Sequence, residues 1–195
     1  MFSERCPFCN IGATNPPAPF TEAESRLASP DAASETTAHM ILSTDHVLAF
    51  LDIMPLTRGH VLVASRRHYE MLGDMGVEAG QEMGKWLPIL SRVVTKTVFG
   101  DDPDRHWNVV QNNGVRAAQV VPHVHFHIIP RPSTYAAKPG FAMFGKGQRE
   151  ELDDEEGAEL AQAMRAELAL EVQRIQENEG IDLSQGSSDK QWGKL

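Results

Sequence analysis

The sequence predicts an α+β protein, with an antiparallel sheet of about five strands, one long helix packed on it, and an extra C-terminal helix. Short apolar segments with short connections predict the sheet, because antiparallel strands need only a tight turn between them. Apolar residues recur at helical spacing between residues 74 and 99. A second helical pattern, rich in acid, covers residues 150–179.

Length and charge narrow the classes of function. A chain of 195 residues with 41% hydrophobic and 23% charged residues is ordinary for a single globular domain. The net charge of −9 argues against nucleic-acid partners and against docking on anionic membranes. No apolar run approaches the roughly 20 residues of a membrane span, and the N-terminus lacks a signal-peptide pattern. We therefore expect an intracellular protein, cytoplasmic or nuclear.

The N-terminal segment carries both cysteines of the chain, Cys6 and Cys9, in a CxxC motif. Such a pair is half of a metal site, a redox pair or an inert pair. A redox pair is expected to follow a strand, and none is predicted here. Residues 11–38, rich in Pro, Ala, Ser and Thr, predict a flexible insertion with a short helix near residues 22–27.

Five apolar segments predict the strands. They comprise residues 41–42, 46–53, 60–64, 107–111 and 123–129. The third has few polar residues, which indicates burial on both of its faces. The turn signal Asn112-Asn113-Gly114 follows the fourth.

The long helix is predicted from Asp74, as its N-cap, to a stop at Gly100. Pro88 lies inside it and predicts a kink, or a break near Leu87, because proline removes a backbone donor and clashes with the preceding turn. The domain is predicted to cover residues 1–145. Residues 146–195 are predicted to form an acidic helical extension with a frayed end.

The segment around which the chain is organised is the ladder His123-Val124-His125-Phe126-His127. A strand has a side-chain period of two, so the three imidazoles are expected on one face. They could ligate a metal, supply a nucleophile with helpers, or be structural. Because the outer two lie roughly 13 Å apart by strand rise, one ion cannot bind all three.

The loop before the ladder, residues 112–119, is rich in small residues and amides. Such a loop lets backbone N–H groups approach an anion. Donors that converge on a phosphate beside a neutral imidazole predict a phosphoryl- or nucleotidyl-transfer site.

These motifs together resemble the histidine triad (HIT) family, in particular its CxxC-containing, phosphoramidase-like (Hint-type) branch. The run His123-Val124-His125-Phe126-His127-Ile128-Ile129 matches the triad pattern, and residues 112–114 with Gln119 resemble the family's phosphate loop. Residues 46–53, 59–63 and 67–68 resemble its earlier strands in order. The resemblance covers about residues 40–133 and the CxxC. It implies a HIT-like fold, a nucleotide-binding domain over residues 1–145, and a homodimer that extends the sheet across a two-fold axis.

The resemblance also implies catalytic roles. His125 is the expected nucleophile, attacking the α-phosphorus through its far nitrogen while its near nitrogen donates to the carbonyl of His123. His127 and Gln119, with Asn112 and loop amides, are expected to hold the phosphate oxygens. Water then releases the nucleoside monophosphate, and no catalytic cofactor is required.

The purine nucleotide is expected to bind beside the triad. Asp52 would accept hydrogen bonds from the ribose hydroxyls, and Ile53 and Phe50 would flank the base. The full set expected to bind nucleotide is Asp52, Ile53, Phe50, Asn112, Gln119, His125 and His127.

A structural zinc site is implied separately, with Cys6, Cys9, His68 and His123 as its ligands. Two thiolates and two imidazoles suit a closed tetrahedral zinc site. His60 is then either a supporting donor near the triad or a core histidine.

The leading hypothesis for function is a hydrolase of nucleoside phosphoramidates or adenylated small molecules that releases AMP through a nucleotidyl-histidine intermediate. A dinucleoside polyphosphate hydrolase (of the diadenosine tri- or tetraphosphate type) is the enzyme alternative. A non-catalytic nucleotide-binding or scaffold protein is the alternative outside enzymes, and an intact triad disfavours it.

Overall fold

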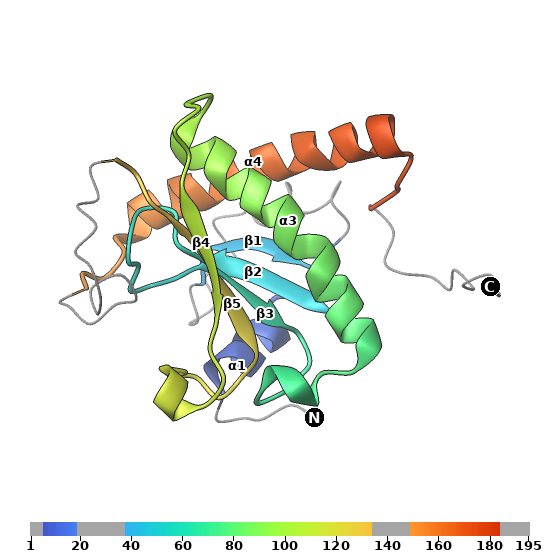
Figure 1. Cartoon of the computed structure of the whole chain (residues 1–195), viewed down its shortest axis with the longest axis vertical. Coiled ribbons are helices and arrows are strands. Elements are labelled where there is room, and N and C mark those ends of the chain that lie inside the picture. The colour runs from blue at the N-terminus through green and yellow to red at the C-terminus, as the bar shows by residue number, and fades with distance from the viewer. Residues whose placement is uncertain (1–5, 19–37, 134–148, 184–195) are drawn as a thin grey trace.

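A computed structural model describes residues 6–18, 38–133 and 149–183, and it has the predicted α+β architecture (Figure 1). Five strands form one antiparallel sheet in the order β1-β2-β3-β5-β4. The strands are β1 (Met40–Ser43), β2 (Val47–Leu51), β3 (Val61–Ser65), β4 (Trp107–Gln111) and β5 (His125–Pro130).

Helices cover both faces of this sheet. The long helices α3 (Val77–Phe99) and α4 (Asp154–Glu179) pack together on one face, and the short helix α1 (Pro7–Thr14) lies on the other. Consecutive residues of β2 therefore point into two separate cores. Val47 and Leu51 pack toward α3 and α4, whereas Leu48 and Phe50 pack toward α1. The prediction that β3 is buried on both faces is confirmed.

Helix α3 begins later than predicted and runs through its proline. Its N-cap is Gly76, whereas Asp74 ends the 3₁₀ turn Leu72–Asp74 and its carboxylate accepts a hydrogen bond from the Met71 N–H. Of the two outcomes predicted at Pro88, a kink or a break near Leu87, the break is wrong, because the helix continues past Pro88 to Phe99 and Gly100 is its C-cap. A proline inside a helix costs about 3 kcal/mol, whereas each large apolar side chain that this helix buries contributes about 1.5–3 kcal/mol.

Helix α4 begins at Asp154, four residues after the predicted start. Asp153 is its N-cap, and the Asp153 carboxylate accepts hydrogen bonds from the N–H groups of Glu155 and Glu156 at 3.0 and 3.1 Å. These interactions explain the acidic first turn, since carboxylates favour the positive end of a helix. Apolar residues of α4, including Leu160 and Met164, belong to the same core as α3.

The prediction of a flexible insertion from residue 11 is wrong for residues 11–18. Residues 11–14 complete α1, and the Arg66 guanidinium then holds the chain by donating to the carbonyls of Gly12 and Asn15 at 2.7 and 2.9 Å. The rest of the proposed insertion, with its short helix, lies outside the described residues. None of the helices in the described ranges is long and apolar enough to cross a membrane.

Candidate active site and metal site

A cavity of about 640 Å³ opens between the end of β2, helix α1, the loop after β4 and strand β5. Its walls are mostly apolar, with a few polar groups, which is the usual character of a small-molecule site. Most of the predicted site residues line it, namely Phe50, Asp52, Ile53, Asn112, His125 and His127. The side chains of Gln119 and His123 make their contacts elsewhere.

His125 lies in this cavity with its tautomer fixed. Its Nδ1 is 2.6 Å from the backbone carbonyl of His123. The Nδ1–H therefore donates to that carbonyl, and Nε2 keeps its lone pair. Burial lowers the pKa of His125 below its ordinary value, which keeps the ring neutral at pH 7. A neutral imidazole with a free Nε2 is a competent nucleophile.

His127 follows on the same strand face and is held by His60. The His60 Nε2 is 3.0 Å from the His127 Nδ1, and the Leu56 N–H donates to the His60 Nδ1. These contacts assign the His60 proton to Nε2 and the His127 proton to its own Nε2. Burial lowers the pKa of His60 to about 2 and that of His127 to about 4, so both rings are neutral at pH 7. His127 can then donate to an anion.

The sequence leaves open whether His60 is a supporting donor near the triad or a core histidine. It is a buried histidine, 1% exposed, and it also contacts the triad. It lies immediately before β3, whose residues pair with β5, and this position brings the two rings together.

Asp52 lies at the end of β2 and borders the cavity. Its Oδ1 accepts a hydrogen bond from the Met54 N–H at 2.9 Å, and its Oδ2 is 3.3 Å from the His60 Nδ1. Burial raises the pKa of this carboxyl, and the Met54 N–H and the Arg149 charge act in the opposite direction. A carboxylate at the rim of an apolar cavity can accept hydrogen bonds from paired hydroxyl groups.

Gln119 organises the loop before the ladder. Its Oε1 accepts a hydrogen bond from the Gly114 N–H at 2.6 Å, and its Nε2 donates to the Glu70 carbonyl at 2.7 Å. The loop needs this support because Gly114 and Ala118 both have positive φ, which is costly for alanine. In this structure the Gln119 amide holds the loop that lies beside His125.

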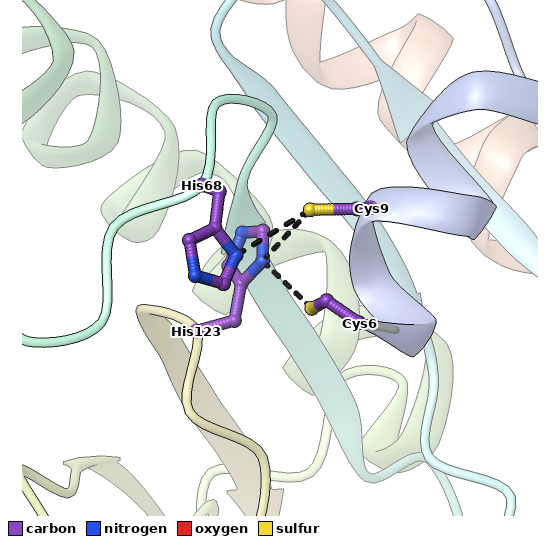
Figure 2. A group of neighbouring side chains, drawn as sticks. All are labelled: Cys6, Cys9, His68 and His123. Carbon is purple, nitrogen blue, oxygen red and sulfur yellow. Dashed lines mark hydrogen bonds between the residues drawn. The ribbon is translucent and has the colours of Figure 1, made fainter. Parts of the chain in front are cut away.

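The first histidine of the ladder lies outside the strand and faces away from the cavity. Figure 2 shows Cys6 and Cys9 pointing toward His68 and His123. The Cys6 Sγ is 3.3 Å from the His123 Nδ1, and the Cys9 Sγ is 3.4 Å from the His68 Nδ1. All four possible ligand atoms lie within 4.8 Å of one another.

These spacings fit a tetrahedral zinc ion. Zinc–sulfur and zinc–nitrogen bonds of the usual length place S and N ligands about 3.6 Å apart. The His123 Nε2 is 2.6 Å from the Ser65 carbonyl, so its proton is on that side and Nδ1 is available to a metal. The four residues present therefore fit a structural zinc site.

Phe8 connects the two sites and was not among the predicted residues. It lies between the two cysteines, lines the cavity, and packs edge-on against His125 at 5.1 Å and Phe50 at 5.3 Å between ring centroids. Ile11, one turn later, lines the same wall. Their spacing in a single turn of α1 is the sequence signal, but without a predicted helix at residues 7–14 it could not be interpreted.

Comparison with known proteins agrees with the family resemblance found in the sequence. A model of the HIT domain matches residues 33–134. An uncharacterized HIT-like protein of Methanocaldococcus jannaschii is 38% identical over 120 residues, 62% of this chain and 87% of that protein. An adenosine 5'-monophosphoramidase of Schizosaccharomyces pombe is 42% identical over 86 residues, 44% of this chain and 59% of that protein.

Among solved structures, a zinc-bound histidine triad family protein from Mycobacterium smegmatis is similar, with a TM-score of 0.59 and 27% identity. The match covers 85% of this chain and 94% of that protein. It extends well beyond the ladder.

Proposed function

Because the chain belongs to the HIT domain family, we propose that it is a hydrolase that acts at the α-phosphate of adenosine nucleotides and releases AMP. Its substrates are nucleoside phosphoramidates or adenylated small molecules. The observation that carries the proposal is the neutral His125, whose Nδ1 is bound to the His123 carbonyl while its ring lines the cavity.

The reaction proceeds in two displacements. The His125 Nε2 attacks the α-phosphorus, and the bond from phosphorus to the leaving group breaks as the N–P bond forms. Water then attacks the same phosphorus and loses a proton, the N–P bond breaks, and AMP leaves with the histidine restored. The proton lost by water balances the one that the leaving group takes up when it departs. His127, through its Nε2–H, and Asn112 at the cavity wall hold the phosphate oxygens as charge develops.

A substrate panel with mass analysis tests this reaction. The unchanged chain is expected to release AMP from adenosine phosphoramidate or from diadenosine tetraphosphate, and to show an intact mass increased by one adenylyl group during turnover. A chain that binds AMP but turns over no adenylyl compound is instead a nucleotide-binding protein.

Asp52 is proposed to bind the ribose hydroxyls, and its replacement by asparagine gives a specific prediction. Hydrogen bonds to a charged group contribute about 2 kcal/mol, so kcat/KM is expected to fall roughly 30-fold. The measurement compares a ribonucleotide substrate with its 2'-deoxy analogue. The variant should discriminate less between them than the unchanged chain does, and an equal loss on both would contradict the ribose contact.

Zinc is proposed as a structural ion at Cys6, Cys9, His68 and His123. It would supply no chemistry to the displacement, because none of these four side chains lines the cavity that contains His125. Cys6 and Cys9 form no disulfide in the structure, and zinc ligation requires free thiolates.

A homodimer is proposed through β4, an edge strand of the sheet. Its Trp107 and Val109 are 43% and 46% exposed, and unpaired edge strands with apolar side chains favour pairing with another strand. Two such edges would join the sheets of two copies.

Replacing Val109 with lysine is expected to convert the dimer to a monomer, because two like charges would face each other across the two-fold axis. Sedimentation velocity at micromolar concentration measures the shift. Ile181→Lys is the matched control, since Ile181 is also 46% exposed but lies beyond α4. If both variants keep the mass of the unchanged chain, β4 is not the interface.

A further inference from the structure

Arg149 reaches the cavity from a part of the chain that the triad motif does not include. It lies five residues before α4, and its side chain extends to the end of β2. Its Nη1 donates to the Met54 carbonyl at 3.1 Å and is 3.9 Å from the Asp52 Oδ2. A guanidinium has five N–H groups, and the bond to Met54 uses one of them. The side chain is 29% exposed and borders the cavity.

Arg149 places a positive charge in a cavity that is otherwise lined mostly by apolar residues. Among the described residues that line the cavity, it is the one lysine or arginine. The histidines there do not compensate for a second anion, since His127 is held neutral by burial. Arg149 lines the same cavity as His125 and His127, and its positive charge is one of the causes that disfavour a proton on His127 and on His60.

The charge of the leaving group should then affect how well a substrate binds in this cavity. Every adenylyl substrate brings a negative α-phosphate, but the leaving group differs. An amine leaving group adds no negative charge, whereas a phosphate or sulfate adds at least one. Asp52 already places a carboxylate in the cavity, so a second substrate anion is repelled unless a cation opposes it.

We propose that Arg149 is a specificity-determining residue that pairs with an anionic leaving group, a phosphate or sulfate joined to the α-phosphorus of the adenylyl substrate. The proposal rests on the function proposed above and deepens it. Arginine suits this role, since its planar fork matches phosphate and sulfate oxygens and stays charged at all working pH values. The substrates that it favours are acid anhydrides of AMP rather than amides.

The first test measures kcat/KM for the anhydrides adenylyl sulfate and diadenosine tetraphosphate against adenosine phosphoramidate. Arg149→Gln is expected to lower kcat/KM for the anhydrides at least tenfold more than for the amide, and Arg149→Lys to restore part of the difference. Arg58→Gln is the matched control. Arg58 also links the β2–β3 connection to α4, by an exposed ion pair with Glu156 outside the cavity, and its loss should leave the substrate ratio unchanged.

A second test does not depend on turnover. In a His125→Ala background, calorimetry compares the binding of ADP and AMP, because the β-phosphate of ADP occupies the leaving-group position. ADP is expected to bind several-fold more tightly than AMP, and Arg149→Gln should abolish that advantage.

The outcomes separate the two proposals. An Arg149→Gln variant that loses both substrate classes equally would assign Arg149 to the ribose or the α-phosphate and overturn the inference. So would a variant with unchanged substrate and ADP-to-AMP ratios. If the unchanged chain hydrolyses nothing, the proposed function fails, and the ADP comparison still decides the role of Arg149.

Discussion

Replacing His125 with alanine is expected to lower the rate of AMP release by at least about 10³-fold, because no other group can take the place of a covalent nucleophile. Binding of AMP should change little. The ring is one of many groups that line a cavity of about 640 Å³, and we propose that other side chains contact the ribose and the base. The expected signature is therefore a large loss in kcat with a nearly unchanged dissociation constant for AMP.

Two measurements check this prediction. Single-turnover kinetics with intact-mass analysis should show the adenylyl adduct in the unchanged chain and none in the variant, while calorimetry follows AMP binding. His106→Ala is the control, because His106 is an exposed histidine that pairs with Asp104 on a loop after α3. Full activity of His125→Ala would exclude this ring as the nucleophile.

The sheet and the two long helices could be predicted because their signals are local. The apolar run at residues 61–64 and the helical period after residue 76 each lie within one element, and most of the apolar residues in both are buried, as the patterns predict. The errors occurred where a contact with a distant part of the chain determines the local structure. Residues 11–18 have no apolar periodicity and contain two prolines, which indicates a flexible segment, but Arg66, more than fifty residues away, holds the carbonyls of Gly12 and Asn15. Similarly, Pro88 predicts a kink or a break in the helix, but the helix is continuous there, and its neighbours Trp86 and Ile89 are buried.

In the candidate site, too, the features with a local signal could be predicted and those that depend on distant contacts could not. Alternation along the ladder correctly predicts that His125 and His127 share one face, since both belong to β5. His123 precedes the strand, so strand period does not govern its ring, and the family resemblance was needed to assign it to the cysteines. The roles of Phe8 and Arg149 follow from contacts between α1, the approach to α4 and the sheet, which no local pattern encodes.

Removing zinc is expected to have the largest effect on stability. The unchanged chain should contain about one zinc ion, and a structural zinc site contributes folding free energy directly. Cys9 is 1% exposed and lies near both histidines, at 3.4 Å from the His68 Nδ1 and 3.7 Å from the His123 Nδ1. Cys9→Ala should therefore lose the metal and about 4 kcal/mol of stability, which lowers the melting temperature by roughly 10–15 °C for a chain of this size.

The same change should reach the nucleotide cavity, because α1 and its N-cap Cys6 carry two of the proposed ligands, and α1 forms one wall of that cavity. Phe8 packs on His125 and Phe50, so release of α1 should weaken AMP binding as well. Metal analysis, melting curves and AMP calorimetry measure the three effects, with His46→Ala as a control for loss of a histidine outside the site. Chelation followed by added zinc separates metal from packing, since restoring the ion should restore stability only in the unchanged chain. A metal-free chain with intact cysteines, the same melting temperature and the same AMP affinity would refute both the zinc site and its link to the cavity.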